Sequence, residues 1–189
     1  MKLLLVGAGG HAKAVVEAIR SRGHVLTAYV DTKPCNWLDD VQRFENDDSF
    51  DEAAGDGLVL GMGAVSPEGL ARRLALFERY RARGWNAPPV WHSTAIVNDS
   101  ASMQAGSMAL ASAVVQPGAE IGEAAIINTA AVVEHDSRIG RGAHVAPGAI
   151  VLGGATIGDG AMVGAGAVVL PGVAVPPGAM VPALERYSG

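Results

Sequence analysis

The sequence predicts two parts in one chain: an α/β domain over residues 1–90 and a parallel β-helix of about five coils over residues 91–189. Two observations carry this prediction. The first is a strand, glycine turn, helix and strand in succession at the start of the chain, and the second is an unbroken six-residue period in its second half. Length alone does not decide between one large domain and two modest ones. The division therefore depends on this change of pattern.

The composition is that of a folded protein with few charges, since charged residues make up 17% and aromatic residues 5% of the chain. The net charge is −5 without a basic cluster, which argues against a nucleic-acid or anionic-membrane surface. Cys35 is the single cysteine, so an internal disulfide is excluded. The apolar run at the start stops at Gly7, which is too short for a signal peptide or a membrane span. We therefore expect a cytoplasmic protein.

The first element is a buried strand over residues 2–6, followed at once by a glycine-rich turn over residues 7–12. A helix is expected to about Arg22, and the next strand, over residues 25–30, ends in Asp31. This succession matches the dinucleotide fingerprint G-x-G-x-x-G/A with an acidic residue about 20 positions on. Such glycines let the backbone approach a phosphate, and the helix N-terminus supplies N–H groups and a positive dipole. The alternative interpretation is a turn that merely closes a βαβ unit.

The remainder of the first domain is predicted from weaker patterns. Residues 32–57 are charged and are expected to form a solvated loop with a short helix at most. A third strand over residues 58–63 runs into a second glycine turn, and Ser66 caps a helix that extends to about Arg83. A connecting segment over residues 85–90 closes the domain. Its size suffices for half of a dinucleotide-binding fold, which favours a mononucleotide or nucleotide-sugar ligand over NAD.

The second part is predicted from a strict repeat. Over residues 97–181 an apolar residue recurs every six positions, fifteen times, and Ala or Ser stands two positions before nearly every one. Each hexad is expected to form one short strand and one turn, and three hexads to close a triangular coil of eighteen residues. Stacked coils bury an inward aliphatic column that a single coil cannot bury. Glycines that follow inward residues are expected at corners with unusual backbone angles; they are Gly122, Gly140, Gly158 and Gly164.

Polar residues that interrupt the repeat are candidates for chemistry. They are Asn128, Glu134, His135, Asp136, Arg138, Arg141 and His144. Because the inward column is aliphatic, we expect these side chains on outward faces or corners, where an exposed histidine is usually an ordinary surface residue. Adding eighteen to 135 places Gly153 beside His135 in the following coil, with a backbone N–H next to the imidazole. A general base beside an N–H donor is the minimal set for acyl transfer.

At this point the chain resembles a known family. Its motifs are similar to those of bacterial sugar acyltransferases of the hexapeptide-repeat, left-handed β-helix superfamily, in particular the group with a Rossmann-like N-terminal domain that acetylates UDP-4-amino-sugars. Sialic acid O-acetyltransferases also look similar. The motifs are Gly7-Ala8-Gly9-Gly10-His11, Asp31-Thr32-Lys33, Ile127-Asn128-Thr129 and Glu134-His135-Asp136. The resemblance covers essentially the whole chain and implies left-handed coils and homotrimers with active sites between subunits.

The resemblance also implies a reaction and roles for residues. The enzyme would move an acetyl group from acetyl-CoA to the 4-amino group of a UDP-linked 4-amino-4,6-dideoxy-sugar, without a metal. His135 would be the general base, Asp136 the carboxylate that orients it, and Gly153 the N–H donor to the oxyanion. Substrate-binding residues would be Gly9, Gly10, His11, Asp31, Thr32, Lys33 and Asn128. Acetyl-CoA of the adjoining subunit would contact His144, and Ala165 and Ala183 would also bind the cofactor.

The C-terminal segment departs from the family pattern and other functions stay open. Relatives place a basic residue after G-x-P-A, whereas Ala183 is followed by Leu184 and Glu185, so Arg186 is the substitute candidate for the CoA 3′-phosphate. Sialic acid O-acetylation and a GDP-linked, perosamine-type acceptor are the nearest alternatives. An NAD-dependent oxidoreductase would need a second mononucleotide half. A hexapeptide-repeat carbonic anhydrase needs three imidazoles for zinc. A non-catalytic nucleotide-binding scaffold is the last alternative.

Overall fold

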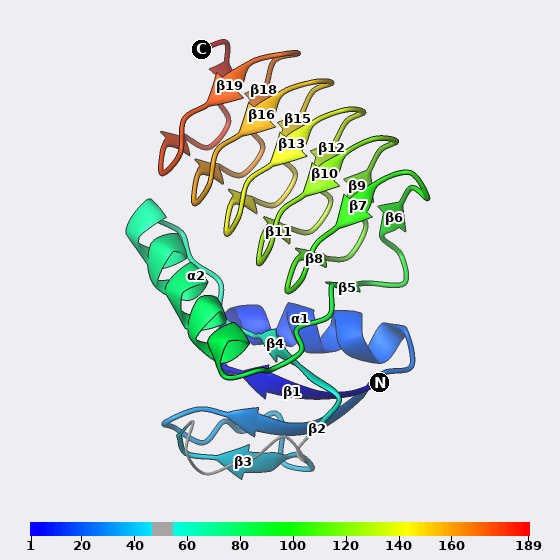
Figure 1. Ribbon diagram of the computed structural model, residues 1–189, viewed down its shortest axis with the longest axis vertical. Helices are drawn as coiled ribbons and strands as arrows, with labels where there is room; N and C mark the ends of the chain where they lie inside the picture. The colour runs from blue at the N-terminus through cyan, green and yellow to red at the C-terminus, as the bar shows by residue number, and fades with distance from the viewer. Residues whose placement is uncertain (47–54) are drawn as a thin grey trace.

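A computed structural model describes residues 1–46 and 55–189 and shows an α/β part below a stack of coils (Figure 1). The described residues of the α/β part form four parallel strands and two helices: β1 (Lys2–Val6), α1 (Gly10–Ser21), β2 (Val25–Val30), β3 (Gln42–Phe44), β4 (Gly57–Leu60) and α2 (Pro67–Ala82). The strand order is β3-β2-β1-β4, so the chain moves outward from β1 and then returns to its other side. This reversal is a topological switch point, and ligands of α/β sheets bind at the carboxyl ends of strands there.

The elements of the α/β part follow from local sequence. Leu3, Leu4 and Leu5 are fully buried in β1, and the Ser66 side chain accepts a hydrogen bond from the Gly69 N–H to cap α2. The described part of the predicted loop over residues 32–57 contains a strand that the pattern did not indicate, β3. It is a three-residue strand at the edge of the described sheet, where it pairs with β2, and it is too short for an apolar alternation to show. Residues 47–54, part of the stretch where a short helix was considered, lie outside the described residues.

The coils contain seventeen two-residue strands in three parallel sheets. The β14 sheet comprises β5 (Val90–Trp91), β8 (Met108–Ala109), β11 (Ile126–Ile127), β14 (His144–Val145), β17 (Met162–Val163) and β20 (Met180–Val181). The β12 sheet comprises β6 (Ile96–Val97), β9 (Val114–Val115), β12 (Val132–Val133), β15 (Ile150–Val151), β18 (Val168–Val169) and β21 (Arg186–Tyr187). The β13 sheet comprises β7 (Ser102–Met103), β10 (Glu120–Ile121), β13 (Arg138–Ile139), β16 (Thr156–Ile157) and β19 (Ala174–Val175).

The predicted fold class is confirmed, and the coil count is slightly larger than predicted. Partner strands are eighteen residues apart, as in the pair Val133 and Val151, so three hexads make one coil. Seventeen strands make nearly six coils rather than five, because one hexad precedes the predicted run and one follows it. These two hexads carry Trp91 and Tyr187 at the inward position, where both pack against the core. Because these two inward residues are aromatic, a count of aliphatic residues at every sixth position does not include their hexads.

The core of the coils is the predicted column. Inward residues such as Ile127, Val133 and Val151 are fully buried, as are the small residues two positions earlier, such as Ala125 and Ala131. Burial of one such Val or Ile side chain contributes about 1.5–3 kcal/mol. Each coil is therefore stabilised by burial against the coils next to it, and a single coil would not be stable alone.

The corners differ from the prediction. A positive φ recurs at every sixth residue from Gly106 to Leu184, three positions after each inward residue. The glycines at 122, 140, 158 and 164 have no positive φ, so the prediction of unusual angles there is wrong. They are glycines because the next coil approaches too closely for a side chain. A Cβ at Gly122 would lie 2.8 Å from the Ile139 carbonyl oxygen and 2.9 Å from the Arg141 nitrogen.

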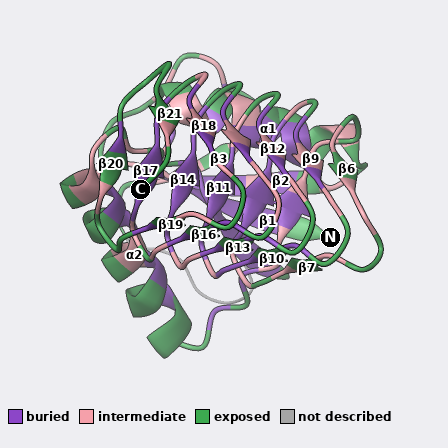
Figure 2. Cartoon of the chain, turned by 90° about the horizontal axis from the view of Figure 1, so that it is seen from above, coloured by how far each residue is buried: buried purple, intermediate pink, exposed green. Residues whose placement is uncertain are grey.

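The α/β part covers one face of the coils. Val90, Met108, Leu110 and Ile126 from the β14 sheet and the turn after β8 belong to the same apolar cluster as the residues of β1 and α1. Viewed from above, β11, β14 and β17 are accordingly coloured as buried (Figure 2). An ion pair adds to this contact, since Arg141 contacts Glu78 of α2 at 2.8 Å. None of the helices in the described part of the chain has the length and apolarity to cross a membrane.

The two kinds of corner glycine should respond differently to alanine. Gly160 has φ +63° with no atom within 4 Å of a would-be Cβ, so Gly160→Ala should cost about 1 kcal/mol through backbone strain alone. Gly122→Ala should cost clearly more, because two backbone atoms of the next coil would have to move. Urea unfolding of both variants at one protein concentration measures this order. Equal losses would contradict the close-approach explanation.

Candidate functional site

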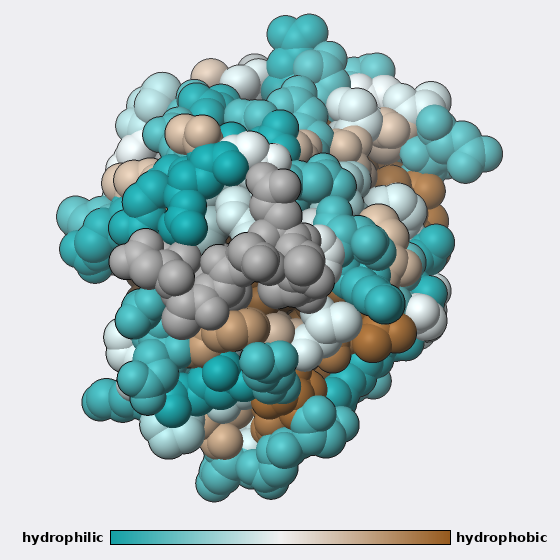
Figure 3. Space-filling model, turned by 60° about the horizontal axis from the view of Figure 1, so that its bottom comes forward, coloured by the Kyte–Doolittle hydropathy of each residue, from teal (hydrophilic) through white to brown (hydrophobic). Residues whose placement is uncertain are grey.

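A cleft of about 1270 Å³ lies between the carboxyl ends of β1, β2 and β4 and one edge of the coils. Its volume exceeds the ~300–1,000 Å³ of ordinary small-molecule pockets, so it can hold an extended ligand. The predicted site residues that line it are Gly9, Gly10, His11, Asp31, Thr32, Asn128, His144 and Ala165. The predicted residues Lys33, Ala183, His135, Asp136 and Gly153 do not line it. The face of the molecule in Figure 3 is mostly hydrophilic, with apolar residues gathered in its lower half.

Two glycine turns meet at the floor of this cleft. Gly7 has φ +87°, and a Cβ there would lie 2.5 Å from the Met62 side chain. A Cβ at Gly61 would lie 2.1 Å from the Gly7 carbonyl oxygen, so both turns require glycine to pass each other. Helix α1 begins here, and Gly9 supplies no side-chain cap to its first turn. The N–H groups of that turn and the positive end of the helix dipole are suited to an anion.

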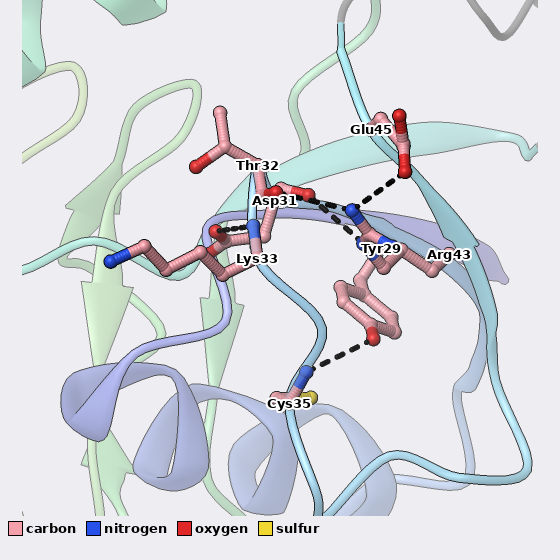
Figure 4. Close-up of polar contacts among 7 residues, drawn as sticks. All are labelled: Tyr29, Asp31, Thr32, Lys33, Cys35, Arg43 and Glu45. Carbon is pink, nitrogen blue, oxygen red and sulfur yellow. Dashed lines mark hydrogen bonds and ion pairs between the residues drawn. The ribbon is translucent and has the colours of Figure 1, made fainter.

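The end of β2 is held by a polar network (Figure 4). The Asp31 carboxylate accepts hydrogen bonds from the Ala8 N–H at 2.8 Å and the Lys33 N–H at 3.0 Å, which ties β2 to the first glycine turn. Arg43 of β3 donates to the Asp31 and Thr32 carbonyl oxygens, and the Lys33 side chain points away from it. Asp31 thus has a structural function in the turn. Its contact with a nucleotide stays a prediction.

Two cleft residues that sequence reasoning missed are Arg79 and Arg83, both on α2. Residues four apart on a helix lie on the same face, so both side chains reach the cleft wall. The i, i+4 pair of cations was visible in the sequence. The sequence alone does not mark this pair as functional, because nothing in it places α2 beside the glycine turns.

His144 lies beneath the α/β part and is only 4% exposed. His144 lies on the outward face of the β14 sheet, as predicted, but this face is buried because the α/β part covers it. The Nδ1 of His144 is 2.9 Å from the Ala64 carbonyl oxygen, which can only accept, so Nδ1 carries the proton. Its Nε2 then accepts from the Asn128 amide at 2.9 Å. The amide oxygen of Asn128 accepts from the Thr129 N–H, which fixes the orientation of this side chain.

Both cleft histidines are held neutral. Burial, then the charge of Arg73 and the neighbouring His144, together lower the pKa of His11 to about 4. Burial and then Arg73 also lower the pKa of His144, against the opposing effect of its hydrogen bond to Ala64. Neither imidazole carries a positive charge at neutral pH. His144 also has both ring nitrogens engaged, so it is suited to orienting Asn128 rather than to moving protons.

His135 and Asp136 stand on a different corner, between β12 and β13. Their side chains are 63% and 74% exposed, and His135 Nδ1 lies 2.9 Å from Asp136 Oδ2. Asp136 has φ +57°, a left-handed conformation that aspartate tolerates better than most residues. The preceding and following coils have glycines next to this pair, where a side chain would collide with it. A Cβ at Gly118 would lie 2.6 Å from Asp136 Oδ1, and a Cβ at Gly153 would lie 2.6 Å from His135 Nε2.

The predicted placement of Gly153 beside His135 is confirmed. The Gly154 N–H donates to the His135 carbonyl oxygen at 2.9 Å, as expected for residues one coil apart. Within residues 1–46 and 55–189, the Gly153 N–H has no hydrogen-bond acceptor. Because Nδ1 of His135 is engaged by the Asp136 carboxylate, Nε2 is the ring atom whose lone pair can take a proton. The corner thus combines a base with the backbone N–H of the adjacent residue Gly153.

One chain therefore carries two separate groups of functional residues. Asn128 belongs to the corner between β11 and β12, at the cleft, beside His144 of the neighbouring strand β14, whereas His135 belongs to the corner between β12 and β13. These corners are the two edges of the β12 sheet. In the described part of the chain, no three His, Cys, Asp or Glu residues are arranged to hold a metal ion.

Comparison with known proteins matches both parts of the chain. Residues 2–65 match the PglD N-terminal domain family, and residues 136–171 match the bacterial transferase hexapeptide family. The acetyltransferase domain of PglB from Neisseria gonorrhoeae FA1090, solved with acetyl coenzyme A, is 28% identical, with a TM-score of 0.87 over 96% of this chain and 88% of that chain. No match was found among curated protein sequences.

A second solved structure is more similar in sequence. It is a histidine-to-asparagine mutant of perosamine N-acetyltransferase from Caulobacter crescentus in complex with CoA and GDP-perosamine. The two proteins are 31% identical, with a TM-score of 0.89 over 97% of this chain and 86% of that chain. WeeI from Acinetobacter baumannii AYE is 21% identical with a TM-score of 0.67, which indicates a shared fold.

The low pKa of His11 should make stability fall on mild acidification. Between about pH 6.5 and pH 4 the unfolded chain binds a proton at this residue that the folded chain does not, so the free energy of unfolding decreases as pH falls. We expect a loss of about 2 kcal/mol between pH 7.5 and pH 5 from this residue. Urea unfolding at both pH values, for wild type and His11→Gln, isolates it. An identical pH dependence in the two proteins would contradict the assignment.

Proposed function

This chain belongs to the hexapeptide-repeat sugar acyltransferase family, and we propose that it transfers the acetyl group of acetyl-CoA to the 4-amino group of a nucleotide-linked 4-amino-4,6-dideoxy-sugar. The observation that carries the proposal is the corner at which His135, held by Asp136, stands beside the free N–H of Gly153. Two of the matched solved proteins support it, since one binds acetyl coenzyme A and the other binds CoA and GDP-perosamine.

The proposed chemistry uses each part of this corner. The sugar nitrogen attacks the thioester carbonyl carbon while His135 Nε2 takes a proton from that nitrogen. The carbonyl oxygen becomes an oxyanion that accepts a hydrogen bond from the Gly153 N–H. When the tetrahedral intermediate collapses, the C–S bond breaks, the CoA thiolate leaves, and His135 returns the proton to sulfur. Asp136 stabilises the imidazolium and keeps the proton on Nδ1, so that Nε2 faces the reaction.

The cleft is the proposed acceptor site. Its glycine turns and the N-terminus of α1 suit the diphosphate of a nucleotide sugar, and Arg79 and Arg83 add positive charge to the wall. Asn128 uses one amide hydrogen for His144, which leaves the other for the sugar. For the donor, Arg186 on the exposed last strand is the proposed contact for the CoA 3′-phosphate, in place of the basic residue that relatives carry.

The outer face of the β12 sheet supports a site shared between subunits. Its outward residues are aliphatic and end in one arginine: Ile96, Val114, Val132, Ile150, Val168 and Arg186. The β13 sheet instead presents polar residues such as Glu120 and Arg138, which pair at 3.5 Å, and the β14 sheet is already covered. We infer that further copies of the chain cover the β12 sheet in a homotrimer. Its two edges carry Asn128 and His135, so packing there can join the cleft of one subunit to the base of another.

A guanosine-linked acceptor is the second candidate, because the solved relative with 31% identity binds GDP-perosamine. The chemistry at the amino group would be the same for either nucleotide. The two are separated by comparing kcat/KM for a UDP-linked and a GDP-linked 4-amino-4,6-dideoxy-sugar.

Removal of the proposed base should abolish most activity without unfolding the protein. His135→Ala is expected to lower kcat by about 10²–10⁴-fold, and Asp136→Asn by less, because the asparagine amide still contacts the ring. The assay is thiol release from acetyl-CoA with each nucleotide amino-sugar. His24→Ala, far from both corners, is the matched histidine control and should act like wild type. Equal rates for His135→Ala and wild type would remove His135 from the mechanism.

A charge on the β12 sheet should break the assembly. Val132→Glu places a carboxylate in the middle of the aliphatic face and should convert a trimer of the 19.2 kDa chain into monomers. Thr156→Glu at the equivalent outward position of the exposed β13 sheet is the control and should leave the trimer intact. Light scattering during gel filtration measures the mass. A trimeric Val132→Glu protein would contradict the proposed interface.

A further inference from the structure

Three residues at the carboxyl edge of the α/β sheet form a row along the cleft. The last residues of β1, β2 and β3 are register partners, so the residues that follow them, Gly7, Asp31 and Glu45, stand side by side. Backbone hydrogen bonds continue the ladder into this row, because the Gly7 N–H donates to the last carbonyl oxygen of β2 at 2.8 Å and the Asp31 N–H to that of β3 at 3.1 Å. All three residues line the cleft. Neighbouring strands lie about 4.8 Å apart, so Glu45 stands two strand spacings from the glycine turn.

A nucleotide sugar placed in this cleft has one order along the row. In nucleotide-binding α/β folds the phosphates lie at the glycine turn, and the acidic residue after the second strand contacts the ribose. The base comes next along the ligand and therefore reaches the end of β3, where Glu45 stands. The sugar lies in the opposite direction, toward Asn128 of the coils. Glu45 is thus a lining residue at the base end of the cleft.

Glu45 is an oriented carboxylate that can accept further hydrogen bonds. Arg43 donates from Nε to the Asp31 carbonyl oxygen at 3.2 Å and from Nη2 to the Thr32 carbonyl oxygen at 3.1 Å, and the same Nη2 donates to Glu45 Oε1 at 3.1 Å (Figure 4). The Glu45 carboxylate is therefore tied to the end of β2, although its side chain is 75% exposed. A carboxylate has about four lone-pair sites. Within residues 1–46 and 55–189, Arg43 is its one hydrogen-bond donor.

This carboxylate is unsuited to the phosphate part of the ligand. A negative charge in the cleft repels the diphosphate. Asp31, the other lining carboxylate, has both oxygens engaged by backbone N–H groups of its own turn and of the first glycine turn. In the described part of the chain, Glu45 accepts from no backbone N–H. Its place in the cleft therefore requires an explanation other than holding a turn.

We propose that the Glu45 end of the cleft is a guanine site, in which this carboxylate accepts hydrogen bonds from N1–H and from the 2-amino group of the base. The inference deepens the proposed function and rests on it, because it names the nucleotide of the acceptor. Guanine presents these two donors side by side, which matches the two oxygens of a carboxylate. Uracil presents one N–H between two carbonyl oxygens, and adenine and cytosine present a ring nitrogen acceptor beside their amino group. A carboxylate is repelled by these acceptor atoms.

The α2 wall of the cleft supplies a surface for the flat face of the base. Leu76 lines the cleft and packs, as Phe44 of β3 does, against the apolar cluster between α2 and the sheet. Arg79 and Arg83 lie on the same face of this helix, and a planar guanidinium can stack on a base. Stacking tolerates any base, since every base has a π-face. The discrimination between bases therefore comes from Glu45.

The alternative function of Glu45 is an ordinary surface ion pair with Arg43. Such a pair contributes little to stability and nothing to the choice of nucleotide. Inosine diphosphate separates the two explanations, because it keeps the purine, N1–H and O6 of guanosine diphosphate and lacks only the 2-amino group.

The test is titration calorimetry of the full-length wild-type protein with guanosine, inosine and uridine diphosphates at one pH and one salt concentration. We expect guanosine diphosphate to bind about 10-fold more tightly than inosine diphosphate, and about 10- to 100-fold more tightly than uridine diphosphate. Glu45→Gln keeps the size of the side chain but replaces one acceptor by a donor, so it should bring guanosine and inosine diphosphates within about threefold of each other. Glu17→Gln, on the exposed side of α1, is the matched control and should keep the wild-type order.

The outcomes separate this inference from the proposed function. Equal affinity of the wild type for guanosine and inosine diphosphates would overturn the guanine site, as would an unchanged ratio in Glu45→Gln. Thiol release from acetyl-CoA that favours the UDP-linked over the GDP-linked 4-amino-4,6-dideoxy-sugar would also overturn it and leave the transferase in place. A guanine preference that Glu45→Gln removes, with no thiol release with either sugar, would support the guanine site and overturn the transferase.

Discussion

The ladder of hydrogen bonds between residues eighteen positions apart sets the position of every functional group on the coils. It stacks inward residues in one column and requires a left-handed backbone conformation at every sixth residue. At the corner of Asp136 the same ladder puts Gly118 on one side of the pair and Gly153 on the other. Because Gly118 and Gly153 have no side chains, the adjacent coils leave space for the His135 imidazole and the Asp136 carboxylate. A one-residue slip in either direction would place a Cβ, that of Pro117 or of Ala119, at the position of Gly118.

The cleft depends on a second constraint, the close fit between the α/β part and the β14 sheet. The fit is mainly apolar, but polar groups at its edge determine what the cleft presents. His144 reaches across to Ala64, Arg73 reaches across to Ala124, and Arg141 pairs with Glu78. These contacts fix the tautomer of one imidazole and the direction of the Asn128 amide. The chemistry of the cleft thus belongs to neither part of the chain alone.

The sequence contained most of the fold because its periods are strict. Fifteen inward positions, both helices and the His135–Gly153 neighbourhood followed from counting, since a ladder of fixed register converts sequence spacing into distance. The end hexads were missed because Trp91 and Tyr187 replace aliphatic residues, and β3 because three residues show no alternation. The burial of His144 and the approach of Arg73, Arg79 and Arg83 depend on how two distant elements dock. No spacing within one element encodes that contact.

The shared apolar cluster beneath the cleft has a consequence for turnover. Val90, Met108 and Ile126 of the coils form one core with β1 and α1, and the buried Arg73 of α2 donates a hydrogen bond to Ala124 of the coils. Swinging the two parts away from each other would expose this core and separate the Arg73 guanidinium from the Ala124 carbonyl oxygen, at a cost comparable to local unfolding. Many enzymes exchange ligands by closing and opening domains. In this protein we expect the walls to stay fixed, so that nucleotide sugars enter and leave by diffusion through a permanently open mouth.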